Sequence, residues 1–160
     1  MPNWCEGVLK IRGTKPNILR FFKEGLAPAT RFQQGEEPEI QIQEDEWGNV
    51  YVSLKDRIFW VKETRRHFID THCFEVYFDE DDETVEQVVV IEEFKAAWGM
   101  DATDLAKLSK IFQLDFKVYG FECGMAFNQS IEIHKGEIIK DETITFKDYE
   151  WECVCPRIGG

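Results

Sequence analysis

Long hydrophobic runs are absent from this chain of 160 residues. No apolar run approaches the roughly 18–20 residues that a helix needs to cross a bilayer. The opening MPNWCEGVLK also lacks the basic segment followed by an apolar one that marks a secretory signal. We therefore expect a cytoplasmic protein with no membrane partner.

Positive charge is scarce as well. The chain has 19 Lys and Arg against 31 Asp and Glu, which gives a formal net charge of −12. A surplus of carboxylates repels the phosphate backbone of DNA and RNA, so the composition argues against nucleic acid as a partner. Apolar side chains are plentiful, with 13 Phe and 5 Trp among the 43% of residues that are hydrophobic. We expect residues 1–160 to fold as one domain around one core.

The five cysteines are an odd number on a chain without an export signal, so we expect reduced thiols. Cys5 and Cys73 lie in apolar, strand-like runs, where cysteine behaves as a small buried hydrophobe. The sequence therefore predicts that both belong to the core.

A metal site is not predicted, and neither is a cofactor. Cys153 and Cys155 are closer in sequence than the cysteines of structural zinc sites, which also need four ligands. Metal binding by this pair stays open. It would require the C-terminal segment to fold back onto His67, His72 and Cys73.

Catalytic motifs are missing too. His67, His72 and His134 have no motif partner, and the chain has no H-E-x-x-H and no glycine loop for phosphate. Counted as a calcium loop, residues 79–90 have Thr84 and Val90 where an EF-hand needs glycine and glutamate. We expect a protein that is not an enzyme. The enzymatic alternative would use Cys123, provided that its thiolate is exposed and favoured.

The first part of the chain predicts a strand, a helix and a loop. Alternation over residues 4–12 predicts a strand with Leu9 and Ile11 on its apolar face. Thr14 then caps a helix with Pro16 in its first turn, and this helix ends at Gly25. The helix has four apolar residues at helical spacing: Ile18, Leu19, Phe21 and Phe22.

The middle of the chain is rich in strand signals. Residues 25–37 have no period and predict a loop. Alternating residues on both sides of Gly48-Asn49 predict a hairpin, and a reversal at Lys55-Asp56 into residues 57–62 would extend it to a three-stranded meander. Residues 73–78 form a further strand, with one face consisting of Phe74, Val76 and Phe78.

The second half repeats the order of strand, helix and strand. Residues 88–97 are apolar and β-branched enough for a central strand. The segment Asp101-Ala-Thr-Asp104 caps a second amphipathic helix, which has an apolar face formed by Leu105, Leu108, Ile111 and Phe112. A strand over residues 114–120 and a hairpin across Lys135-Gly136 follow.

This order predicts an α+β fold of the ferredoxin-like, split βαβ type, with two helices on one face of the sheet. Residues 25–87 would be an inserted, β-rich meander, and residues 123–155 a C-terminal extension built on a β-hairpin.

Two groups of residues resemble a known family, the YubB-type ferredoxin-like domain proteins. The opening Met-Pro-Asn-Trp-Cys, with its strand ending in Gly13, is similar to the start of that domain. Ala97-Trp98-Gly99 and the residues that follow look like its second half, which include Leu105, Leu108, Phe112, Phe116, Tyr119 and Gly124. The resemblance covers residues 1–24 and about 90–135. It implies a protein of phages, plasmids or integrated mobile elements, in the host cytoplasm if a phage encodes it, and it brings no catalytic residues.

Charge patterning gives the functional hypothesis. Two acidic patches are expected to bind a basic surface on a host or defence protein, as an inhibitor or modulator of a nucleic-acid-processing or host-defence protein would do. The patches consist of Glu36, Glu37, Glu39, Glu44, Asp45 and Glu46, and of Asp79, Glu80, Asp81, Asp82 and Glu83. The alternative is a nucleic-acid-binding module that stacks bases on an open sheet face, with Tyr119, Phe121 and Tyr77 as the aromatic residues.

Overall fold

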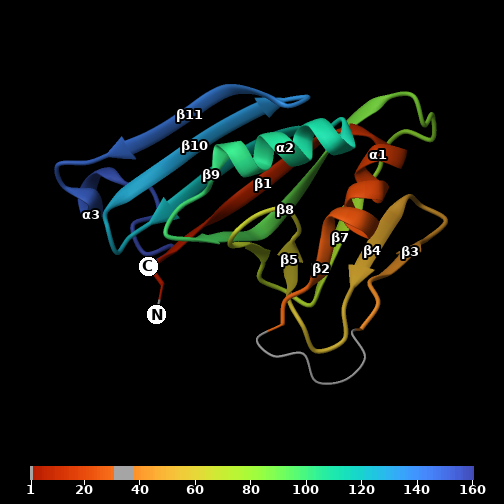
Figure 1. The fold of residues 1–160 in the computed structure, drawn as a ribbon, viewed down its shortest axis with the longest axis horizontal. Helices are drawn as coiled ribbons and strands as arrows, with labels where there is room; N and C mark the ends of the chain where they lie inside the picture. Colours follow the sequence, from red (N-terminus) through yellow and green to blue (C-terminus); the bar gives the residue numbers. More distant parts are fainter. Residues whose placement is uncertain (1, 31–37) are drawn as a thin grey trace.

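The computed structural model describes residues 2–30 and 38–160. It shows an α+β protein that is mostly antiparallel sheet with few helices (Figure 1). In chain order, the elements are β1 (Trp4–Thr14), α1 (Lys15–Arg20), the π-helical turn η1 (Phe21–Gly25), β2 (Leu26–Pro28), β3 (Gln41–Glu44), β4 (Asn49–Ser53), β5 (Phe59–Val61), β6 (His67–Ile69), β7 (Cys73–Tyr77), β8 (Glu86–Ala97), α2 (Ala102–Phe112), β9 (Asp115–Glu122), β10 (Phe127–His134), β11 (Glu137–Thr145) and α3 (Tyr149–Glu152).

The strands form two sheets. The large sheet has eight strands in the order β11-β10-β9-β1-β8-β6-β5-β2, and the small sheet has three in the order β3-β4-β7. Neighbouring strands run antiparallel throughout. β1 lies between β8 and β9, so the first strand of the chain is at the centre of the large sheet.

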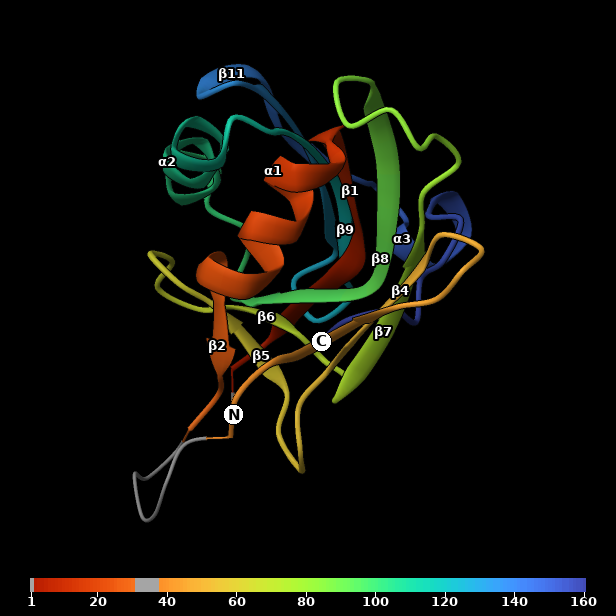
Figure 2. The ribbon, with the colours of Figure 1, turned by 90° about the vertical axis from the view of Figure 1, so that its right-hand side faces the viewer.

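The helices α1 and α2 cover the same face of the large sheet (Figure 2). The ring of Phe21 in η1 lies 5.4 Å from that of Phe112 in α2 and 5.5 Å from that of Phe116 in β9. Ile18 and Leu105 are fully enclosed in the same hydrophobic cluster. Burying a large apolar side chain stabilises a fold by about 1.5–3 kcal/mol, so this layer accounts for much of the cohesion of the protein. The predicted α+β class is confirmed, and α1 and α2 lie on one face of the large sheet.

The small sheet packs against the same core. The ring of Phe74 in β7 lies 5.2 Å from that of Phe22 in η1 and 5.2 Å from that of Phe59 in β5. Val76 and Phe78 are also buried, as predicted. Cys73 is exposed, which corrects the prediction that it belongs to the core. The cause is the alternation of a strand: if Phe74 and Val76 face inward, Cys73 must face solvent.

The predicted meander contains one wrong strand. The hairpin around Gly48-Asn49 is confirmed as β3 and β4, but within the predicted strand 57–62 only β5 (Phe59–Val61) forms, and it pairs with β2 and β6 in the large sheet. The third strand of the small sheet is β7. Part of the predicted 25–37 loop is the short strand β2, and residues 31–37 lie outside the described part of the chain.

The helix boundaries follow their sequence signals with two corrections. Pro16 is in the first turn of α1 as predicted, but the Thr14 side chain makes no capping hydrogen bond. Asp101 caps α2, because its carboxylate accepts hydrogen bonds from the backbone N–H of Thr103 and of Asp104. Ile111 is 54% exposed and does not belong to the buried face of α2. No described helix is both long and apolar enough to cross a membrane.

A bulge bends β8. Between Gly7 and Leu9 the register with β8 shifts, so Val8 opposes two residues, Glu92 and Glu93. An extra residue in one strand bends that strand and increases its twist, and Figure 2 shows β8 curving strongly. This bend carries β6, β5 and β2 away from the plane of β9 and β10.

Candidate functional site

Residues from each of the two predicted acidic patches lie together at one end of the small sheet. The backbone N–H of Phe78, at the end of β7, donates to the carbonyl of Gly48 in the β3–β4 turn, at 3.1 Å. This contact places the turn residues Asp45 and Glu46 beside the start of the acidic run at Asp79. We call residues 44–46 and 79–83 the acidic end.

The carboxylates of the acidic end fall into two groups. Asp45 holds the turn, because it accepts hydrogen bonds from the backbone N–H of Trp47 and of Asn49, both at 2.9 Å, and from Asn49 Nδ2 at 2.7 Å. The Asn49 side chain is the main cause of a lowered pKa at Asp45. Asp82 holds a turn by accepting hydrogen bonds from the backbone N–H and the hydroxyl of Thr84, which lower the pKa of Asp82.

The other carboxylates hold no turn. Glu44 pairs with Lys15, and the rest point to solvent. Five carboxylates are exposed and have no ion pair within residues 2–30 and 38–160: Glu46, Asp79, Glu80, Asp81 and Glu83. Glu39 is exposed as well, and Glu36 and Glu37 lie outside the described residues. The acidic end therefore keeps most of its negative charge unneutralised.

Exposed aromatic side chains surround this charge. Trp47 is at the tip of the β3–β4 turn and is 70% exposed, and Tyr77 is 53% exposed at the end of β7. Tyr51 is 42% exposed, and its hydroxyl lies 3.5 Å from the Asp45 carboxylate. Aromatic residues with a large exposed surface are typical of protein interfaces. The sequence prediction missed Trp47, although an aromatic residue in a hairpin turn has no core position to fill.

The three aromatics of the nucleic-acid alternative are not together. Tyr119 and Phe121 lie side by side on β9, with ring centroids 5.2 Å apart. They are on the face of the large sheet that α1 and α2 leave open, because their neighbours Phe116 and Val118 face the core. Tyr77 belongs to the small sheet.

His67 is a buried histidine with one unpaired nitrogen. Its Nε2 accepts a hydrogen bond from the backbone N–H of Asp101 at 3.0 Å, so in the neutral ring the proton is on Nδ1. Nδ1 is buried and has no hydrogen-bond partner in the described part of the chain. Burial lowers the pKa of His67 to about 4, and the ring is neutral at physiological pH. His67 thus positions the start of α2. Its Nε2 already accepts a hydrogen bond and its Nδ1 carries the proton, so the ring is not arranged to act as a base.

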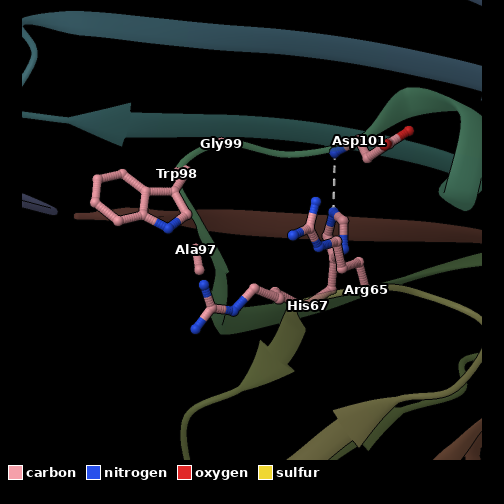
Figure 3. A pocket seen from close by; sticks show the side chains of 7 residues that line it. Arg65, His67, Ala97, Trp98, Gly99 and Asp101 are labelled. Atoms are coloured by element: carbon pink, nitrogen blue, oxygen red, sulfur yellow. Dashed lines mark hydrogen bonds between the residues drawn. The ribbon is translucent and has the colours of Figure 1, made fainter. Parts of the chain in front are cut away.

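A pocket of about 220 Å³ lies beside this histidine (Figure 3). Arg65, Arg66 and Trp98 line it together with His67. Trp98 is 59% exposed and has a φ of 69°. A left-handed backbone is costly for a bulky residue, and such strain is found most often at functional sites. The strained, exposed indole beside two arginines therefore marks this edge of the molecule as a candidate binding region.

The cysteine candidates have structural partners. Cys153 is buried, with its Sγ 3.5 Å from Asn128 Nδ2, and Cys123 donates through its Sγ to the carbonyl of Gly159 at 2.8 Å. Cys5 is fully buried as predicted, and burial raises its pKa to about 12. Over the described ranges, no group of three or more His, Cys, Asp or Glu side chains is arranged to hold a metal ion. Cys153 and Cys155 are accordingly not joined by His67, His72 or Cys73.

Comparison of the chain with protein-family models, with curated proteins and with solved structures found no match. The resemblance to the YubB-type family stays a prediction.

Proposed function

We propose that this protein is a non-enzymatic binding module whose acidic end binds a basic surface of a partner protein. One observation carries the proposal. The β3–β4 turn lies beside the start of the 79–83 run, and both carry carboxylates without an ion pair among the described residues, next to the exposed side chains of Trp47, Tyr51 and Tyr77.

The two kinds of side chain have complementary roles in binding. Carboxylates attract a partner with clustered Lys and Arg side chains and set its orientation during encounter. Desolvated aromatic rings contribute most of the binding energy at protein interfaces. Because carboxylates imitate phosphates in charge, the partner class that fits is a protein with a basic, nucleic-acid-binding groove. The protein would then act as an inhibitor or modulator of a nucleic-acid-processing or host-defence protein.

The fold assignment belongs to the same proposal. The strands β9-β1-β8-β6 are consecutive in the large sheet, α1 follows β1, and α2 connects β8 to β9. This order supports a ferredoxin-like, split βαβ core with the other strands added to it. Such a core favours membership of the YubB-type family, and with it an origin in a phage or another mobile element.

The test compares two variants with the same change in net charge. In the first variant, the acidic end is reversed by Glu46→Lys, Asp79→Lys and Asp81→Lys. In the control, exposed carboxylates at the other end of the chain are reversed by Glu137→Lys, Asp141→Lys and Glu150→Lys, none of which has an ion pair among the described residues. Each protein is immobilised and used to capture proteins from a bacterial lysate, and the captured proteins are quantified by mass spectrometry and then purified for direct binding.

We expect a basic protein that the wild type and the control capture and the first variant does not. Its purified form should bind more weakly as salt rises, because charges on an exposed surface are screened over about 10 Å at 0.1 M ionic strength. Trp47→Ala should weaken the binding by at least about tenfold, as expected for an aromatic residue at an interface. Equal capture by the two charge variants would show that the acidic end is not the binding surface.

A further inference from the structure

A second surface has the opposite charge. A groove of about 730 Å³ crosses the open face of the large sheet near the N-terminus of the chain. Among the described residues, its lining contains three cationic and three aromatic side chains and no carboxylate: Arg57, Arg66, Lys95, Trp4, Trp60 and Phe68. In a chain with a net charge of −12, a groove of this size whose described lining has no carboxylate is unexpected. We call it the basic groove.

The sheet register builds this groove from distant parts of the sequence. Trp60 in β5 pairs with Phe68 in β6, Phe68 pairs with Lys95 in β8, and Lys95 pairs with Glu6 in β1. Paired residues of antiparallel strands lie on one face. Because Glu6 also pairs with Phe121, the groove and the aromatic pair on β9 share the open face of the sheet.

The aromatic rings are held in place. The Lys95 ammonium lies 4.5 Å from the centroid of the Trp4 ring, and the Phe68 ring meets Trp4 edge-on at 5.9 Å. Lys95 also pairs with Asp70 at 2.5 Å. The Trp60 indole N–H donates to the carbonyl of Thr64 at 3.2 Å. All three rings are half-buried, so each is fixed by the protein and still lines the groove.

Two of the three cations have no polar side-chain partner among residues 2–30 and 38–160. The side chains of Arg57 and Arg66 make no ion pair or hydrogen bond with another residue in the parts of the chain that the structure describes. Arg66 lines both the groove and the pocket of Figure 3, where the exposed Trp98 lies. The groove and the pocket therefore form one region, with Arg66 between them.

We propose that the basic groove binds single-stranded nucleic acid, with bases against Trp4 and Trp60 and phosphates at Arg57 and Arg66. Aromatic rings bind any base through stacking, and arginine pairs with phosphate oxygens, so the two groups together recognise a nucleotide strand. A duplex does not present the faces of its bases. The groove is also longer than one nucleotide requires, because its lining residues extend from β1 across β8 and β6 to β5.

The negative charge of the molecule does not prevent this binding. The acidic run precedes β8, and about 30 Å of strand separates Glu86 from Lys95, at about 3.3 Å a residue. Charges this far apart are largely screened at about 0.1 M ionic strength, where the Debye length is about 10 Å. Closer to the groove, Asp70 pairs with Lys95, so Arg57 and Arg66 are the cations of the lining that stay available for phosphate.

The test measures the fluorescence anisotropy of a labelled oligothymidylate of about eight nucleotides, and of the matching oligouridylate, at about 0.1 M salt. The variant Arg57→Ala/Arg66→Ala removes two side chains that touch no other described residue through polar contacts. The control Lys23→Ala/Lys147→Ala removes two exposed cations elsewhere. Trp60→Phe keeps an aromatic ring in the groove, and Trp60→Ala removes it.

We expect the arginine variant to bind at least about tenfold more weakly than the wild type, and the control to bind as the wild type does. Trp60→Phe should bind better than Trp60→Ala. If Trp60→Ala does not fold, the comparison of the arginine variant with the lysine control tests the proposal. Three results would each overturn the proposal: no binding up to about 0.1 mM protein, which is the range of non-specific affinity; equal binding of the duplex; or thymidine monophosphate binding as tightly as the oligonucleotide.

Discussion

His67 links the pH of the solution to the stability of the fold. Burial lowers its pKa to about 4, from an ordinary value of 6.5. The neutral form is therefore favoured in the folded state, while the unfolded state takes up a proton as the pH falls below 6.5. Stability that is fully present above that pH is lost on acidification towards pH 4.

We predict that His67 alone makes the free energy of unfolding fall by about 1.3 kcal/mol between about pH 7.5 and 5.5. Urea denaturation at the two pH values measures this change. His67→Gln should remove the contribution, because glutamine does not titrate, and His72→Gln should keep it, because His72 is exposed. The same pH dependence in wild type and His67→Gln would contradict the prediction.

Single residues were predictable where their chemistry is local. The capping carboxylate of Asp101 and the position of Pro16 depend only on adjacent residues, and both predictions are confirmed. Cys73 and Ile111 were predicted as core residues from their apolar surroundings and are exposed. Cys73 faces the opposite side of its strand and Ile111 lies beside the buried face of its helix, and composition does not resolve a shift of one position.

At the scale of elements, β1 and β9 approach each other closely at Gly7. A Cβ at Gly7 would lie 1.9 Å from the Tyr119 carbonyl oxygen and 2.8 Å from Gly120 Cα, both backbone atoms of β9. A Cβ at Gly13 would lie 2.4 Å from Leu114 Cδ2, the end of a side chain that can rotate away. A side chain at Gly7 would therefore clash with backbone that cannot move easily, whereas one at Gly13 would clash with a side chain that can.

We predict that Gly7→Ala destabilises the fold by about 3 kcal/mol or more, because two strands of the central sheet must separate. Gly13→Ala should cost about 1 kcal/mol. Urea denaturation followed by tryptophan fluorescence measures both. If the two variants lose the same stability, backbone contact at Gly7 is not what requires glycine there.

Strands were easier to predict than their partners. Alternation of apolar and polar residues identified β1, β3, β4, β7 and the β10–β11 hairpin. The partner of β5 was predicted wrongly, because a strand of three residues, Phe59–Val61, joins whichever sheet edge is available. That choice depends on β6, which follows closely in the sequence, and on β2, which lies about 30 residues earlier, and both are too short to have a pattern.

At the scale of the whole molecule, the acidic end adjoins the small sheet and the basic groove lies on the large sheet. The surplus of negative charge follows directly from the composition, and the two acidic runs in the sequence predicted part of the acidic end. The sequence prediction missed the basic groove, because Arg57, Arg66 and Lys95 are spread over the sequence and meet only through the order β5-β6-β8. Trp4 and Trp98 belong to the segments that carry the family resemblance, and this was the one signal that pointed to the region.

The claim that the protein has two separate binding surfaces of opposite charge is tested most directly by NMR. The amide spectrum of one labelled sample is recorded with a short oligolysine peptide and, separately, with oligothymidylate. We predict that the peptide shifts amides of residues 44–51 and 77–83, and that the oligonucleotide shifts amides around Trp4, Arg57, Trp60, Arg66 and Lys95. If both ligands shift the same amides, or if neither ligand shifts any, the claim is wrong.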